Sequence, residues 1–143
     1  MAITSAICNS FKTEILTGTH NFTASSGNTF NLALYTSDAT LNKSTTAYTT
    51  SNEVSGTGYT AKGNALTSVT PVASSTTAVC DFADTSFTSA SFTARGCMIF
   101  NEDASGDPSV CVIDFGSDKT VTSGTFTIQF PTADASNAII RIA

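Results

Sequence analysis

Apolar and polar positions alternate along most of this chain, and a spacing of two predicts β-strands. The alternation is clearest at residues 125–130, where Phe126, Ile128 and Phe130 are separated by Thr and Gln. The same pattern predicts three further strands, at residues 29–35, 78–82 and 137–143. One apolar and one polar face per strand is typical of antiparallel sheets that cover a core on one side.

The segment 5–17 follows a different spacing. Every fourth residue is a large apolar one, which predicts one face of an amphipathic helix. The residues of this face are Ile7, Phe11 and Ile15. Thr4 or Ser5 can cap the start of this helix and Gly18 can end it.

Two segments, 97–100 and 110–115, are almost continuously apolar and flank a loop rich in Asp, Gly and Pro. We expect them to form a hairpin that is covered on both faces. One cover is the core, and the other is either the N-terminal helix or a neighbouring subunit. The candidate subunit-interface residues are Cys97, Met98, Ile99, Phe100, Val110 and Val112.

The remaining segments are mostly polar. Residues 116–124 begin and end with glycine and predict another hairpin turn, and the Thr- and Gly-rich stretch 36–64 predicts long loops or short edge strands. Together the elements predict a mainly β protein: one antiparallel, jelly-roll-like β-sandwich domain over residues 1–143, with a single N-terminal helix.

Composition narrows the class of protein. Serine and threonine fill 45 of the 143 positions, ten residues are Phe, and the net charge is −5. A chain of this length can bury one core, and its aromatic content argues against disorder. The acidic balance argues against nucleic acid as a partner. No signal peptide and no apolar stretch of about 20 residues is found, so we expect a cytoplasmic origin and no membrane contact.

The four cysteines are widely spaced, with no CxxC motif and no neighbouring histidine, which argues against a zinc site. We expect Cys8, Cys80, Cys97 and Cys111 to be buried thiols. The alternative is a Cys97–Cys111 bridge across the hairpin, formed after release from the cell.

Catalytic motifs are missing. The one histidine, His20, has no GxSxG motif to accompany it and is expected in an exposed loop. The Asp114-Phe115-Gly116 triplet lacks the other kinase motifs and is interpreted as the end of a strand. Asp81 and Asp84 could form a glycosidase pair, although they fit a strand end and its loop equally. The tyrosines that could stack on a sugar are Tyr35, Tyr48 and Tyr59.

The acidic loop of the predicted hairpin is the strongest candidate for a metal site. Its oxygen ligands are Asn101, Glu102, Asp103 and Asp107, and such a group could hold Ca²⁺. The spacing differs from that of an EF-hand, and hairpin turns favour the same residues. We therefore predict no metal and no cofactor, with calcium as the alternative.

Several segments, in this order, resemble a group of small virion proteins of tailed bacteriophages. After the N-terminal helix come the segments FNLALYTS (30–37) and NEVSGTGYT (52–60). The hairpin segment ARGCMIFN (94–101) leads into ASGD (104–107), and the terminal strands follow 116–124. Where such proteins often carry an Arg shortly after the motif Tyr, this chain has Lys62.

The resemblance implies a β-sandwich that serves as a structural part of the virion and has no catalytic site. We expect a capsid decoration or cement protein that stabilises capsomer junctions. The alternative is a tail fibre or receptor-binding module. The expected partners are the major capsid protein and further copies of the chain, as a homotrimer. The helix face with Ile7, Phe11 and Ile15 is the candidate capsid contact.

Overall fold

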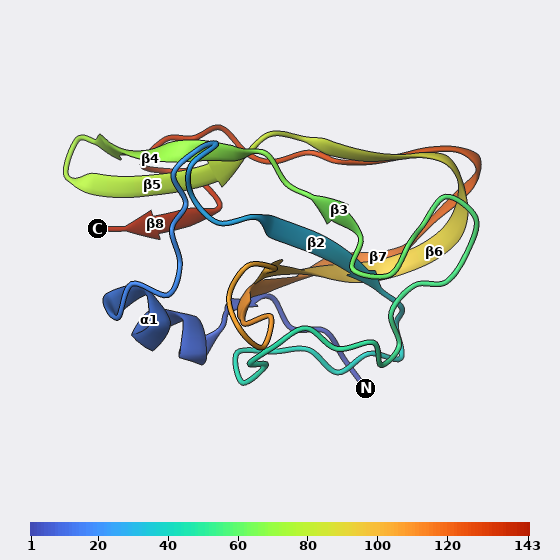
Figure 1. Ribbon diagram of the computed structural model, residues 1–143. Coiled ribbons are helices and arrows are strands. Elements are labelled where there is room, and N and C mark those ends of the chain that lie inside the picture. Colours follow the sequence, from blue (N-terminus) through green and yellow to red (C-terminus); the bar gives the residue numbers. More distant parts are fainter.

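The computed structural model describes all residues, 1–143, as eight strands and one helix in two antiparallel sheets (Figure 1). The elements in chain order are β1 (Ala6–Ile7), α1 (Asn9–Leu16), β2 (Phe30–Tyr35), β3 (Asn64–Ala65), β4 (Ser68–Ser74), β5 (Thr77–Phe82), β6 (Thr85–Asn101), β7 (Ser109–Ile128) and β8 (Ile140–Ile142). The expected fold class, a mainly β sandwich with one helix, is confirmed.

The two sheets differ in size. The larger has the strand order β1-β7-β6-β2-β3, and the smaller has the order β4-β5-β8. In the larger sheet Leu34 pairs with Cys97, and Cys97 pairs in turn with Ile113. The expected strands at 29–35, 78–82 and 137–143 correspond to β2, β5 and β8.

The hairpin of β6 and β7 is long enough to contribute to both layers. It runs along the lower layer in Figure 1, curves through the right-hand end and returns along the upper layer. Between the pairs Ala94–Lys119 and Gly96–Asp114, β7 has three more residues than β6, and this excess bends the hairpin. The expected hairpin turn at 116–124 is therefore wrong, because Gly116 bends a continuous strand instead of ending it.

The helix is shorter than the apolar spacing predicts. Ile7 pairs with Cys111 in β1, so residues before Cys8 belong to the sheet and the helix begins at Asn9. Cys8 stands at the cap position without a side-chain hydrogen bond, so neither Thr4 nor Ser5 caps the helix. Its end is as expected, since Gly18 follows with a φ of 76°.

The outer face of the larger sheet is covered by the chain itself. Residues 36–56 run beneath this face as extended loops, together with the N-terminal segment (Figure 1). Isolated bridges join Ile3 to Leu41 and Ala47 to Pro108. The hairpin is thus covered on both faces, as expected, and the stretch 36–64 is mostly loop.

This cover changes the interpretation of the candidate interface strands. Cys97, Met98, Ile99, Phe100, Val110 and Val112 are all between 0% and 1% exposed. They belong to the chain's own core and offer no surface to a second subunit, so the expectation of an interface there is wrong. The physical reason is that the loop segment 36–56 supplies the second cover.

Aromatic side chains fill the space between the sheets in two clusters. One lies near the helix and contains Phe11, His20, Phe22, Phe30, Phe82 and Phe130. The other lies inside the bend of the hairpin and contains Tyr59, Phe87, Phe92, Phe115 and Phe126. Together they account for most of the ten phenylalanines, which explains why a chain without Trp can fill its core.

Candidate functional site

His20 is buried, contrary to the expectation of an exposed loop histidine. Its side chain is 0% exposed, and its ring centroid lies 4.9 Å from that of Phe11 and 6.1 Å from that of Phe30. Its Nε2 lies 2.8 Å from Glu14 Oε2, and its Nδ1 lies 3.2 Å from Asn101 Nδ2. The imidazole therefore has no open space in which a substrate could reach it.

The hydrogen bonds of Asn101 fix the proton on this imidazole. The backbone N–H groups of Asp103 and Ala104 both donate to Asn101 Oδ1, so Asn101 Nδ2 must face the histidine and donate to Nδ1. His20 then carries its proton on Nε2 and donates it to Glu14. Both ring nitrogens are engaged in joining the helix end to the hairpin loop, which is a structural role.

The acidic loop of the hairpin is occupied by a lysine. Lys62 Nζ lies 2.9 Å from Glu102 Oε1 and 2.9 Å from Asp107 Oδ2. These two carboxylates, as hydrogen-bond acceptors, raise the pKa of Lys62. Asp103 accepts a hydrogen bond from the backbone N–H of Thr29. The side chains considered for calcium are therefore engaged with a cation and a backbone donor of the same chain, and no group of metal ligands is found.

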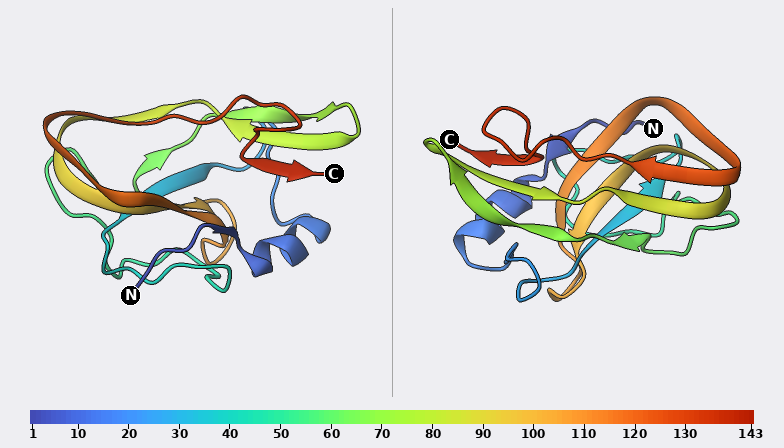
Figure 2. Two further views of the ribbon diagram at one scale, coloured as in Figure 1. Left: turned by 180° about the vertical axis from the view of Figure 1, so that it is seen from behind. Right: turned by 90° about the horizontal axis from the view of Figure 1, so that it is seen from above.

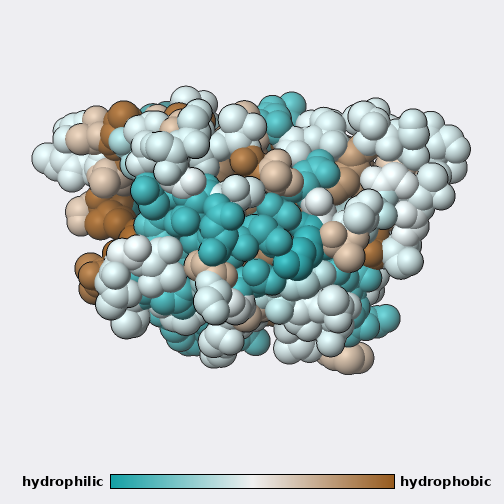
Figure 3. Space-filling view, in the orientation of Figure 1, coloured by the Kyte–Doolittle hydropathy of each residue, from teal (hydrophilic) through white to brown (hydrophobic).

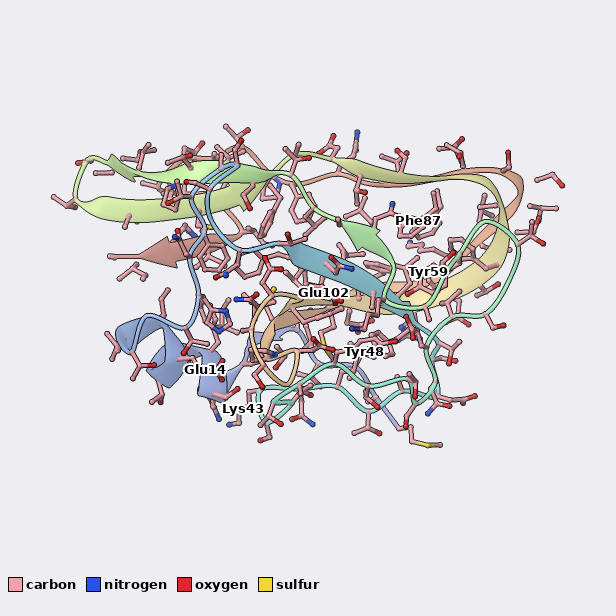
Figure 4. All side chains as sticks on the ribbon, in the orientation of Figure 1. Glu14, Lys43, Tyr48, Tyr59, Phe87 and Glu102 are labelled. Atoms are coloured by element: carbon pink, nitrogen blue, oxygen red, sulfur yellow. The ribbon has the colours of Figure 1, made fainter.

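Glu53 organises the loop that carries Lys62, and two of its partners, Tyr48 and Tyr59, are labelled in Figure 4. Its Oε1 accepts hydrogen bonds from Tyr59 Oη at 2.7 Å and from the Lys62 backbone N–H at 2.7 Å. Its Oε2 accepts one from Tyr48 Oη at 2.6 Å. Burial is the main cause that raises the pKa of Tyr48 to about 12, and the hydrogen bond to Glu53 is the second cause. Four residues of this loop region thus form one hydrogen-bonded unit.

The tyrosines considered as sugar platforms are not free aromatic faces. Tyr35 is 0% exposed and donates to the Thr49 carbonyl at 2.7 Å. Tyr48 and Tyr59 are half-buried and direct their hydroxyls at Glu53. Gly63 completes this packing, because its φ is 65° and a Cβ there would collide with the Leu32 carbonyl.

Asp81 and Asp84 do not line a common cleft. Asp81 is 2% exposed, and its Oδ1 accepts a hydrogen bond from the Phe82 N–H at 2.9 Å. Burial raises the pKa of Asp81. Asp84 Oδ1 accepts a hydrogen bond from the Phe130 N–H at 2.7 Å, which attaches the end of β7 to the start of β6. The pair therefore serves the backbone and is not placed for acid–base catalysis.

All four cysteines are free and buried, as expected. The Cys97–Cys111 bridge is not formed, since Cys97 pairs with Ile113 and Cys111 pairs with Ile99. Desolvation by burial raises the pKa of Cys80 and of Cys97 to about 12. A thiol with such a pKa is a poor nucleophile at neutral pH, so none of the four is placed for catalysis.

An apolar groove with a volume of about 530 Å³ lies between the two limbs of the bent hairpin. Its walls come from both limbs of β7 and from the segment that follows it. The apolar lining residues are Cys97, Ile113, Phe115, Phe126, Ile128, Phe130, Pro131 and Ile139. Lys119 is the one charged residue among its walls. This groove contains no nucleophile–base pair. Because most of its lining residues are apolar, it is suited to binding apolar groups. We call it the β7 groove.

A second apolar feature lies at one end of the molecule. Leu16 is 87% exposed, Val72 is 57% exposed and Ile142 is 54% exposed. Brown atoms gather at the left end in Figure 3, where β4, β8 and α1 end, and the centre of this view is hydrophilic. Of the expected capsid-contact face, by contrast, Phe11 is 3% exposed, and Ile7 and Ile15 pack against the core.

The fold and these clusters define a β-sandwich whose polar side chains maintain its loops. Comparisons with protein-family models, with curated proteins and with solved structures find no match. The single helix has eight residues, and no helix is long and apolar enough to cross a lipid bilayer.

Proposed function

We propose that this chain is a structural protein of a tailed-bacteriophage particle, most specifically a decoration or cement protein that stabilises the junctions between capsomers. The observation that carries the proposal is that the candidate reactive side chains are already engaged within the chain. His20 joins Glu14 to Asn101, and Lys62 pairs with two carboxylates of the acidic loop. The features that remain available for a function are therefore surfaces that can bind a partner, and not side chains that can react.

The segments that carry the family resemblance support a shared architecture. FNLALY forms strand β2, whose backbone pairs with six residues of β6. NEVSGTGYT supplies Glu53 and Tyr59 to the network beneath the hairpin loop. Lys62, found where such proteins often have Arg, takes the role of the cation in that network. FNLALY, NEVSGTGYT and Lys62 therefore each have a structural role in this fold.

The contact with the major capsid protein is best assigned to the exposed apolar end. Leu16, Val72 and Ile142 are large apolar side chains without cover, and they come from three different elements. A specific contact of this kind needs roughly 800 Å² per partner, which the sandwich end can supply together with its polar surroundings. The helix contributes through Leu16 and not through Phe11.

The number of copies per particle tests this function. Intact particles are separated on a denaturing gel, and the stain in the band of this chain is compared with that of the major capsid protein. A decoration protein must be present in hundreds of copies. A few copies per particle would contradict decoration and would favour the tail fibre or receptor-binding module. Absence from purified particles would refute any virion role.

A further inference from the structure

The outer edge of strand β7 has no partner strand over most of its length. β7 pairs with β6 on one side, but on the other side it pairs with β1 only at Cys111 and Val112. Ser5 Oγ accepts the N–H of Asp114, and from Phe115 to Ile128 no further strand lies along the outer side of β7 (Figure 2). Such an edge is a template for another strand.

The two edges of the smaller sheet are protected against pairing. β4 carries Pro71 and a bulge between Val69 and Val72, which interrupt its outer hydrogen-bonding groups. β8 is three residues long and includes Arg141. Residues 124–128 of β7 contain neither a charge nor a proline, so this is the edge best suited to pairing.

The β7 groove lies directly beside this edge. Phe126 and Ile128 are half-buried and line it, while Thr125 and Thr127 are exposed. A strand added to the edge would place every second side chain over the groove. Five residues of strand are only about 17 Å long, so a stable contact also needs the apolar area of the groove.

We propose that a second copy of this chain occupies the edge, by antiparallel pairing of β7 with β7 about a two-fold axis near Thr125. Residues 120–133 carry no charge, so two chains of net charge −5 can meet there without opposing like charges. The partner must itself present an unprotected edge, and β7 is the edge of this chain that does so.

The two-fold arrangement is reciprocal. Antiparallel pairing about Thr125 sets Phe126 of each copy opposite Gly124 of the other and diagonally beside its Phe126, which lines the β7 groove, so the two copies make the same contact. The inference adds contact between copies of the chain to the proposed function and rests on that function for its biological role. It replaces the homotrimer, which was expected by analogy with decoration proteins, by a dimer.

A charge exchange at the axis tests this pairing. Thr125→Lys and Thr125→Glu each place like charges opposite one another in the dimer, and both substitutions are at an exposed side chain. Sedimentation equilibrium at micromolar concentration should show a dimer for the unmodified chain and at least tenfold weaker association for each variant. An equimolar mixture of the two variants should recover the dimer.

Thr88→Lys is the matched control, because Thr88 is an exposed threonine on β6 and not on the free edge. It should leave the dimer intact. The proposal is overturned if the unmodified chain is monomeric at every concentration, if it is a trimer, or if both Thr125 variants associate as strongly as the control.

Cross-linking gives an independent measurement. Thr125→Cys should form a covalent dimer on mild oxidation, whereas Thr88→Cys should not, and the four natural thiols are buried and do not interfere. A cross-link at both positions or at neither contradicts the two-fold axis. A dimer that is absent from particles would refute the proposed function alone, and a monomer abundant in particles would refute this inference alone.

Discussion

Asp81 is a single side chain whose burial is unfavourable for its charged form. It is the one acidic residue with a buried oxygen, Oδ2, that has no hydrogen-bond partner. Burial raises its pKa in the folded chain, so folding favours the protonated form. Its stabilising contribution is therefore complete at a pH below the ordinary pKa of an aspartic acid and is lost as the pH rises through the raised folded value.

Replacing the Asp81 carboxyl group tests the predicted direction of this pH dependence of stability. Asp81→Asn removes the ionisable group and should raise the free energy of unfolding by about 1 kcal/mol at pH 7, since an unsatisfied buried charge is lost. The gain should shrink as the pH falls from the raised folded value towards about 3.8, the ordinary value, and should not change further below it. Urea unfolding at several pH values measures this, and a variant that is less stable throughout the range would contradict it.

The two phenylalanines inside the bend provide a second comparison at this scale. Phe92 is 7% exposed and packs 5.2 Å, centroid to centroid, from Phe126, which is half-buried at the β7 groove. Phe92→Ala should cost about 3–5 kcal/mol of stability. Phe126→Ala should cost about 2 kcal/mol, because less apolar area is lost. Thermal unfolding of dilute protein measures both, and equal costs would place Phe126 wholly in the core.

The thiols give a prediction about reactivity. Desolvation by burial raises the pKa of all four cysteines, and the value for Cys80 is about 12. A disulfide reagent added to the folded protein at pH 8 should therefore label none of them within the time in which it labels all four in urea. Rapid labelling of any thiol in the folded chain would show that its cover opens readily.

Among the elements, the loop that contains Glu53 is held by a few polar contacts. Glu53→Ala removes the acceptor of three hydrogen bonds and should cost about 3 kcal/mol, at about 1 kcal/mol for each. Glu53→Gln keeps the shape and one acceptor oxygen and should cost much less. Glu102→Ala breaks an ion pair that is one-third exposed and should have the smallest effect. Denaturant unfolding ranks the three, and an inverted order would contradict the role of Glu53.

Strands with regular alternation could be predicted from the sequence, and strands with interrupted alternation could not. β2 and β5 keep an uninterrupted spacing of two between their large apolar residues, which are Phe30, Leu32 and Leu34 in β2 and Cys80 and Phe82 in β5. The first half of β6 was not predicted. Its inward residues Phe87, Ala90 and Phe92 are separated by register shifts, which break the spacing of two. β4 was not predicted because Ser, Thr and Val are exposed along most of it.

The candidate site was less accessible to sequence reasoning, because its contacts join distant positions. His20 has the pattern of a loop residue, and its burial depends on Asn101, 81 positions away. Lys62 meets Glu102 across 40 positions. The sequence alone indicates that known catalytic motifs are missing. Which charged side chains pair with one another can be known only from the fold. The free edge of β7 could not be predicted either, because the sequence indicated a turn at 116–124.

At the scale of the whole molecule, both proposed contacts lie on the surface of the sandwich. The chain exposes 6984 Å², and its large exposed apolar side chains include Leu16 and Ile142 at one end. In the proposed dimer the β7 edge is the contact between copies, and in the proposed function the apolar end is the contact with the capsid. These two surfaces come from different elements, so they can be occupied at the same time.

The most direct test of this account is the heat resistance of particles that lack the chain. Such particles should release their DNA at a lower temperature than complete particles, and added purified chain should restore the original temperature. Leu16→Ser, which alters an 87% exposed side chain and should fold normally, should restore it only in part. Particles that release DNA at the same temperature with and without the chain would contradict a reinforcing role.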